Sequence, residues 1–272
     1  YKEGKAVLDK RIVSNEQWWK LRHWGEIGCD KDDTRPMPAS AWLFNSLANK
    51  HADAMDNIPE PTVLPREKSD EEVAKQLSLI LPAILERCGY EKLYSDGWWY
   101  KLKNGSMCTA VVWDPDADGG MGDIAIRNAD ILNLFWEPGI KDIEESANLF
   151  YVTLVDRERL NLMYPELLGE DTESVAGGTG NVEKYKTEDK TDDSAKVEVI
   201  DWYYKKTING RKQLCYCKFC GDRVIYSSED DESCADGFYK HSRYPFVMDT
   251  LFVQEGTPCG FGYIDVMRDA QM

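Results

Sequence analysis

The spacing of apolar residues changes near Trp98, and this change limits the folds that the chain can adopt. From Val73 to Cys88 the apolar side chains recur at the roughly 3.6-residue period of a helix. After Trp98 they form short strand-like runs separated by turn residues such as Asn104-Gly105. Helices followed by strands are typical of the α+β class, so we expect a helical N-terminal part packed on mixed or antiparallel sheets.

Two helices are expected before that region. Ser14 and Gln17 have the spacing of a capping box, which predicts a short helix that starts there and carries Trp18 and Trp19. The prolines of "TRPMPAS" end it, because each proline removes an amide donor and restricts the residue before it. A second helix is then predicted from about Ala39 to Met55.

The clearest predicted helix begins at Ser69, which forms a second capping-box pattern with Glu72. Gly89 is expected to end this helix in the left-handed conformation that a glycine C-cap adopts. Pro82 lies inside the pattern and cannot donate a hydrogen bond to the preceding turn, so a kink is expected there.

The central part is predicted to consist mainly of strands. "WWYKL" and "MCTAVVW" are expected to pair through the Asn104-Gly105 turn, because Asn-Gly is a strong hairpin signal. A second hairpin is predicted to join Val112-Trp113 to Ile124-Ile126 through "DPDADGGMGD". "ILNLFWEPG" and "NLFYVTLV" indicate two more strands, followed by a short helix from Asp156 to Leu168.

Residues 169–196 contain few apolar side chains and are expected to form a mobile acidic linker or loop. The sequence then indicates a three-stranded meander formed by "VEVIDWYYKKT", "KQLCYCKF" and "RVIYSS". Turns at Asn209-Gly210 and Gly221-Asp222 are predicted to join these strands.

Composition excludes several classes of protein. With 272 residues, of which 42% are hydrophobic, the chain can bury one sizeable core or two modest ones without disulfides. No apolar run approaches the roughly 18 residues of a membrane span, and the N-terminus does not resemble a secretory signal, so a soluble protein made inside the cell is expected. A net charge of -16 repels phosphate and argues against a sequence-reading DNA-binding protein, but it is compatible with a tunnel that DNA passes without sticking.

The eight cysteines are expected to be reduced packing residues, because they are too sparse for a disulfide scaffold. Cys217, Cys220 and Gly221 nevertheless have the C-x-x-C-G spacing of a zinc knuckle. A structural zinc site needs two more ligands, and only single candidates such as Cys234 and His241 are available. We therefore predict no metal and no cofactor, and keep a small zinc-binding protein centred on Cys217 and Cys220 as an alternative.

No catalytic constellation is visible, so the chain is predicted not to be an enzyme. "DPDADGG" resembles the start of an EF-hand loop, but Ala125 occupies the position that requires a bidentate glutamate. The three histidines lie in different segments without a nearby nucleophile. Two further alternatives are a carbohydrate- or peptide-binding module that uses exposed Trp98 and Trp99, and a hydrolase whose carboxylates come from the acidic loops.

Three stretches resemble the portal proteins of long-tailed phages and prophages from Gram-positive hosts. They are "AWLFNSLANKHADAMDNIPEPTVLPREKSDEEVAKQLSLILPAIL", "WDPDADGGMGDIAIRNADILNLFWEPG" and "GFYKHSRYPFVMDTLFVQEGTPCGFGYIDVMRDAQM". The resemblance implies that the first two belong to the wing, an α/β domain that projects from a ring. It also implies that the last stretch leads into the first stem helix, where Ile264, Met267 and Met272 would contribute to the oligomer.

The resemblance also implies how the chain is divided. Residues 1–168 would form the wing core, 169–196 the mobile loop, and 197–258 the meander with an extended segment of the wing. Residues 259–272 would begin a truncated stem helix, so that the chain is expected to be a fragment whose clip, second stem helix, tunnel loop and crown lie beyond Met272.

The function implied by the resemblance is structural. Portal subunits form a dodecameric ring at one capsid vertex of the virion, after synthesis in the cytoplasm of the bacterial host. The implied partners are other copies of the chain, the terminase large subunit, capsid or scaffold proteins, head-completion proteins, and double-stranded DNA that passes through the ring non-specifically. No membrane partner is implied.

Overall fold

A computed structural model describes residues 1–25, 36–164, 196–208 and 210–271. The chain divides into two compact units that are discontinuous in sequence. Unit 1 comprises Tyr1–Glu16, Asp130–Tyr244 and Gln254–Pro258, whereas unit 2 comprises Gln17–Ala129, Pro245–Val253 and Cys259–Met272. The division of the chain at residues 168, 196 and 258 that the resemblance implies stays a prediction.

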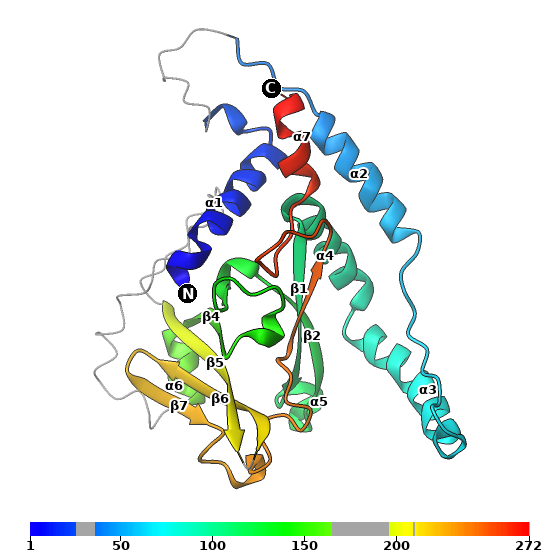
Figure 1. Ribbon diagram of the computed structural model, residues 1–272, viewed down its shortest axis with the longest axis vertical. Coiled ribbons are helices and arrows are strands. Elements are labelled where there is room, and N and C mark those ends of the chain that lie inside the picture. The colour runs from blue at the N-terminus through cyan, green and yellow to red at the C-terminus, as the bar shows by residue number, and fades with distance from the viewer. Residues whose placement is uncertain (26–35, 165–195, 209, 272) are drawn as a thin grey trace. The chain divides into compact units, whose positions relative to one another are not determined.

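Unit 2 contains a three-stranded antiparallel sheet in the order β2-β1-β8 (Figure 1). Its strands are β1 (Ser106–Asp114), β2 (Asp123–Ala129) and β8 (Phe246–Thr250). The pairing of Trp113 with Ile124 confirms the predicted hairpin through residues 114–123. Within this loop lies the single turn α5 (Ala117–Gly120), so the aspartates of "DPDADGG" lie in a hairpin connection rather than between two helices.

The longer helices of unit 2 are α2 (Trp42–Met55), α3 (Glu71–Arg87), α4 (Tyr90–Asn104) and α7 (Tyr263–Gln271). Helices α2, α4 and α7 contact one another, and the last turn of α1 (Lys2–Trp19) also belongs to this unit. Their shared core consists of Trp18, Leu43, Leu47, Leu102 and Ile264. The predicted second helix is confirmed, and its inner face supplies two of these core residues.

The predicted strand at "WWYKL" is wrong, because these residues belong to helix α4. Trp98 and Leu102 are four residues apart, so in a helix both can face the same core. Asn104-Gly105 ends this helix instead of turning a hairpin, since Gly105 adopts a φ of 86° as a left-handed C-cap. An Asn-Gly dipeptide can form either a hairpin turn or a helix C-cap. Here it forms a helix C-cap, because the helix before it packs in the core.

Neither predicted capping box is formed. Helix α1 begins at Lys2, so Ser14 lies in its interior; the residues before it are mostly good helix formers, and they extend the helix. A 3-10 turn at Lys68–Asp70 precedes α3, and the Ser69 hydroxyl donates to the Asp70 carboxylate rather than capping the helix. Gly89, by contrast, has the predicted left-handed conformation, with a φ of 64°.

Unit 1 contains a five-stranded antiparallel sheet in the order β3-β4-β5-β6-β7. Its strands are β3 (Leu134–Phe135), β4 (Asn148–Asp156), β5 (Lys196–Ile208), β6 (Arg211–Cys220) and β7 (Arg223–Ser227). The last three strands confirm the predicted meander. Helix α6 (Arg157–Met163) follows β4, and the rest of the helix predicted to Leu168 lies outside the described residues, as does the expected acidic loop up to residue 195.

The predicted strand at "ILNLFWEPG" is reduced to the two residues of β3. Ile131–Asn133 forms a 3-10 turn instead, because the Asp130 carboxylate accepts a hydrogen bond from the backbone amide of Leu132. Pro138 cannot donate to a sheet ladder, which prevents the strand from continuing.

A buried lysine joins α1 to the segment before β3 within unit 1. Lys5 is only 5% exposed. Its Nζ donates to the backbone oxygens of Ile131, Leu132 and Leu134 at 2.5, 3.1 and 2.7 Å, and lies 3.3 Å from an Asp9 carboxylate oxygen. The same atom lies over the Phe135 ring, 4.3 Å from its centroid. The Lys5 ammonium group therefore has a hydrogen-bond acceptor for each of its three hydrogens, and these bonds offset the free-energy cost of burying the charge.

Helices and antiparallel sheets in both units confirm the predicted α+β class. No helix among the described residues is long and apolar enough to cross a membrane.

Candidate functional site

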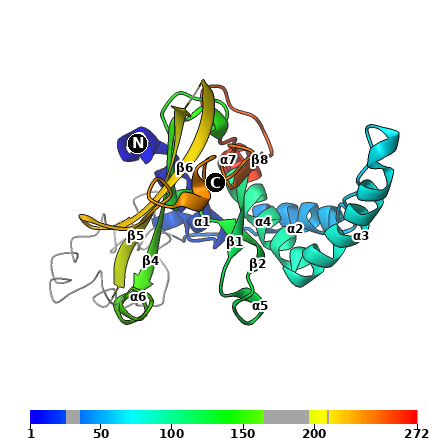
Figure 2. The same ribbon diagram turned by 90° about the horizontal axis from the view of Figure 1, so that it is seen from below.

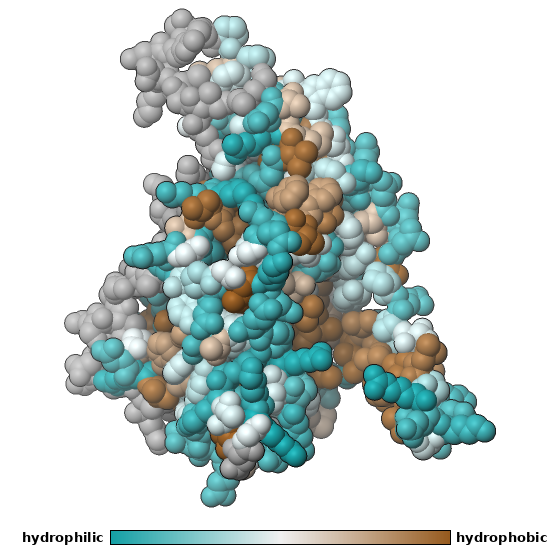
Figure 3. Space-filling model, in the orientation of Figure 1, coloured by the Kyte–Doolittle hydropathy of each residue, from teal (hydrophilic) through white to brown (hydrophobic). Residues whose placement is uncertain are grey.

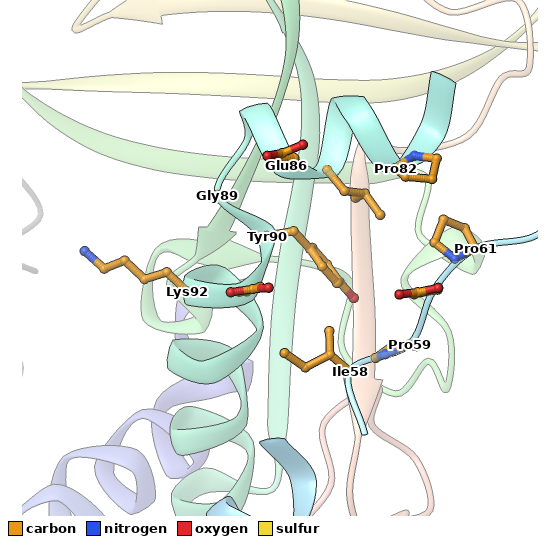
Figure 4. A pocket seen from close by; sticks show the side chains of 11 residues that line it. Ile58, Pro59, Pro61, Pro82, Glu86, Gly89, Tyr90 and Lys92 are labelled. Atoms are coloured by element: carbon orange, nitrogen blue, oxygen red, sulfur yellow. The ribbon is translucent and has the colours of Figure 1, made fainter. Parts of the chain in front are cut away.

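A groove of about 630 Å³ lies at the bend between α3 and α4 in unit 2. Pro82 and Glu86 of α3 form one wall, and Pro59 and Pro61 of the segment after α2 form the other. Figure 4 shows the Tyr90 side chain, at the start of α4, extending toward the proline-bearing segment. Burial raises the pKa of the Tyr90 hydroxyl, with smaller contributions from Tyr94 and Asp249.

The groove is built from conformationally restricted residues. Prolines fix the backbone on both walls, and Gly89 supplies the left-handed bend between the two helices. Ser78 fastens the extended segment to α3, because its hydroxyl oxygen accepts from the Val63 amide at 3.1 Å and donates to the Val63 carbonyl at 3.3 Å. The described residues that line the groove include no serine, cysteine, threonine or histidine. The groove is a partly apolar recess bordered by glutamates and by the ammonium group of Lys92.

Two of the three predicted stem-helix residues, Ile264 and Met267, belong to α7. Ile264 is fully buried among Trp18, Leu43, Leu47 and Leu102, and Met267 packs against this cluster. Met272 lies outside the described residues. Sequence analysis assigned Ile264 and Met267 to an oligomer contact, and the structure adds that both already pack within unit 2, so a stem role stays a prediction.

Replacing Ile264 with valine is expected to lower the free energy of unfolding by about 1 kcal/mol, because one buried methylene is lost from a packed cluster. Val266 lies on the same helix and is 60% exposed, so Val266→Ala serves as the control and is expected to change stability by less than about 0.5 kcal/mol. Denaturant unfolding measures both values. Equal effects of the two substitutions would show that Ile264 is not a core residue.

Trp98 and Trp99 do not form an open aromatic platform. Both side chains are partly buried and pack against the core cluster of unit 2. Trp99 stacks on His51 with ring centroids 4.1 Å apart, and the Lys101 ammonium lies 4.6 Å from the Trp98 ring centroid. The faces that a sugar or peptide would need are therefore occupied by the protein's own side chains.

The structure brings together one histidine-hydroxyl pair that sequence analysis missed. His51 Nε2 lies 3.1 Å from Ser95 Oγ and 3.2 Å from the Ser95 backbone oxygen. A carbonyl oxygen can only accept, so we assign a hydrogen to Nε2, which then cannot take a proton from the hydroxyl. The pair joins α2 to α4, and no sequence motif predicts it because its members come from separate helices.

Cys217 and Cys220 both lie in strand β6, before the Gly221 turn, rather than within a tight metal-binding turn. Both thiols are buried, and burial raises the pKa of each, which favours the neutral thiol over the thiolate that zinc binds. Among the described residues, no three His, Cys, Asp or Glu side chains are grouped closely enough to hold a metal ion. The geometry thus gives no support to the zinc alternative.

The buried Cys108 of β1 is expected to resist thiol reagents in the folded protein, whereas the partly exposed Cys88 should react readily at about pH 8. Burial, followed by the nearby Cys259, raises the pKa of Cys108 to about 12. Because an unfolded thiol ionises near 9, the contribution of Cys108 to stability should fall as pH rises from about 9 to about 12. Peptide mass spectrometry after timed labelling measures the two rates, and similar rates would contradict this assignment.

The chain matches the family model described as "Phage P22-like portal protein" over residues 52–232, well over half of its length. This match places it in the class of phage portal proteins, which are structural proteins. The chain belongs to the P22-like phage portal protein family. No curated protein sequence matches the chain.

The match confirms the portal resemblance seen in the sequence. It includes α3, α4, the β1–β2 hairpin and the meander of unit 1, but it ends before α7. The particular likeness to long-tailed phages of Gram-positive hosts stays a prediction.

Proposed function

We propose that this protein is a subunit of a closed portal ring, the conduit at one capsid vertex through which the phage genome is packaged and ejected. The single observation that carries the proposal is the family match over residues 52–232. We further propose that the ring has twelve subunits and docks the terminase large subunit, capsid or scaffold proteins and head-completion proteins. The protein would be made in the host cytoplasm and reside in the virion.

The charge of the chain supports the proposal that DNA passes without being held. A net charge of -16 disfavours strong binding to phosphate, and affinity for duplex DNA normally depends on lysine and arginine contacts. In this proposal α7 leads toward the stem, and Ile264 and Met267 couple it to the helical core of unit 2.

Negative-stain electron microscopy of the purified protein tests the proposal. Particles with a central hole and cyclic symmetry are the expected result. Uniform small particles without a hole, across the salt and protein concentrations that assemble portal rings, would contradict it. Weak DNA binding that disappears as salt is raised is expected in parallel, because the contacts with phosphate are non-specific.

A further inference from the structure

Helix α3 is the least buried of the longer helices of unit 2. Only one of its 17 residues, Ala74, is buried, and the described core cluster of the unit contains no residue of α3. Its apolar residues Val73, Leu77 and Ile80 are 56%, 41% and 50% exposed. Figures 1 and 2 show α3 leading away from the β1–β2 hairpin, and Figure 3 shows hydrophobic residues gathered along this part of the molecule. Burial in the core of unit 2 therefore does not fix the position of this helix.

The extended segment before α3 is fastened to this helix. The Ser78 hydroxyl bonds both the amide and the carbonyl oxygen of Val63, at 3.1 and 3.3 Å. Pro61 and Pro65, on either side of Val63, restrict the backbone of the segment. The segment and the helix are therefore joined into one body, residues 58–87, which we call the arm.

The chain crosses between the arm and the rest of unit 2 at two points. It enters the arm through Asp56 and Asn57, directly after α2, and leaves it at Gly89, directly before α4. All three residues are exposed. Helices α2 and α4 lie outside the arm and are joined through the core residues Leu47 and Leu102. Two exposed crossings beside a packed core are the arrangement of a hinge, in which a few residues at element ends absorb the change in backbone angles.

Cys88 and Gly89 separate α3 from α4, and Gly89 makes the bend between them. Gly89 has a φ of 64° and a ψ of 41°, whereas Cys88 is already near the helical region, with a φ of -75° and a ψ of -5°. No atom of the described residues lies within 4 Å of the position that a Cβ would take at Gly89, so its surroundings do not force this conformation. Glycine adopts left-handed and right-handed conformations about equally readily. A change of Gly89 to the right-handed region, with a small adjustment at Cys88, would join α3 and α4 into a continuous helix.

Two contacts close to Gly89 stabilise the bend. Arg87 forms an ion pair with Asp123 at 3.0 Å, and the Cys88 thiol donates to the Ile124 carbonyl oxygen at 3.3 Å. The ion pair is solvated, because the Arg87 side chain is 59% exposed and that of Asp123 is 25% exposed, and exposed ion pairs contribute little to stability. A thiol is a weak donor. These contacts therefore favour the bent position only weakly.

A straight arm would gain backbone hydrogen bonds in their place. In a continuous helix each amide donates to the carbonyl oxygen four residues earlier. The Tyr90 amide would then donate to Glu86, and the next amide along the chain would donate to Arg87. In the bent position these groups lie at two helix ends, where they have no partners within the helix. The two positions therefore differ by small free-energy terms of opposite sign, which is the condition for both to be populated.

We propose that the arm swings about Asn57 and Gly89, and that the ion pair between Arg87 and Asp123 is a latch for the bent position. The groove at the bend is lined by residues of α3 and by the first residues of α4 (Figure 4). Straightening moves these two walls apart, so the hinge sets the width of the groove. The inference concerns unit 2 alone and does not depend on the proposed ring.

Double electron-electron resonance spectroscopy measures the swing. Nitroxide labels are attached through p-acetylphenylalanine, which leaves the native cysteines unmodified, at Leu79 on the arm and Val247 on β8, which are 71% and 59% exposed. The control pair is Val247 with Val266 of α7, which is 60% exposed and lies in the same unit outside the arm. The labelled full chain is diluted with unlabelled protein, so that distances between copies do not contribute. We expect two distances for the arm pair, one of them minor, and one narrow distance for the control pair.

Two substitutions of Gly89 test whether the motion arises at this residue. Alanine disfavours the left-handed conformation, so Gly89→Ala should raise the population of the second distance by about tenfold. Gly89→Asn is the matched control and should give a much smaller change, because asparagine tolerates the left-handed conformation. A single narrow distance for the arm pair that Gly89→Ala leaves unchanged would overturn the inference. Two distances that Gly89→Ala leaves unchanged would also overturn it, because the motion would then arise elsewhere.

The latch is tested with the same pair of labels. Arg87→Ala should raise the population of the second distance by about two- to threefold, because an exposed ion pair is lost. Lys206→Ala removes an ion pair of similar exposure, with Glu229 of unit 1, and should have no effect. Equal distance distributions in the two variants would overturn the role of the Arg87–Asp123 ion pair as a latch.

Discussion

Gly105→Ala is expected to lower the free energy of unfolding by about 4 kcal/mol. The backbone of Gly105 has a φ of 86°, which costs an alanine about 1 to 2 kcal/mol. An added Cβ would also lie 2.2 to 2.5 Å from backbone atoms of Phe261, which cannot rotate away as a side chain could. Denaturant unfolding of unit 2, followed by tryptophan fluorescence, measures the loss.

Gly89→Ala is the matched control for this prediction. Gly89 also follows a helix and also has a positive φ, of 64°, but no atom lies within 4 Å of the position that its Cβ would take. Only the conformational cost of about 1 to 2 kcal/mol should therefore appear. If both variants lose the same amount, the close approach of residues 105 and 261 is not a determinant of stability.

Lys5→Met is expected to destabilise unit 1 by about 3 kcal/mol. Methionine fills a similar volume but leaves the backbone oxygens of Ile131, Leu132 and Leu134 without their shared donor in a buried setting. Thermal or denaturant unfolding measures the loss.

Lys10→Met, at an exposed position of the same helix, controls for the change of residue type and should alter stability by less than about 0.5 kcal/mol. A Lys5 variant as stable as the Lys10 variant would mean that the three carbonyl oxygens find other donors, for example water, and that the lysine does not hold α1 in place.

The sequence predicted helices and strands correctly where the local residue pattern is compatible with only one secondary structure. The meander of unit 1 and the hairpin of unit 2 alternate apolar and polar residues between glycine-containing turns, and both were located within a few residues. Gly89 was predicted to be left-handed for the same reason, because few other residues adopt that conformation at low cost.

Prediction failed where a segment could form either of two secondary structures and tertiary contacts determine which one it adopts. "WWYKL" has the aromatic content of a strand, yet it folds as the last turns of α4 because Leu102 packs against residues far away in sequence, including Leu47 and Ile264. Ser14 carries a helix-start signal, but the residues before it extend the helix past the signal. Capping patterns indicate where a helix can begin, not where it must begin.

The candidate sites were harder to predict than the fold. The groove depends on Pro59, Pro61 and Pro82 meeting across a bend, and each proline was visible in the sequence only as an isolated breaker. Val73, Leu77 and Ile80 of α3 were visible in the sequence as a helical stripe, but periodicity cannot distinguish a stripe that faces its own core from one that stays exposed. The buried position of Ile264 likewise required knowledge of α2 and α4.

The pairing of β1 with β8 imposes an order on biosynthesis. Ser106 pairs with Thr250, so on the ribosome the middle strand of this sheet is made long before its second neighbour. Until that neighbour emerges, β1 presents an open edge, and the helices that pack with α7 lack part of their core. Late completion of this kind favours slow maturation of the sheet, and the edge of β1 stays available for incorrect pairing until translation has passed Thr250.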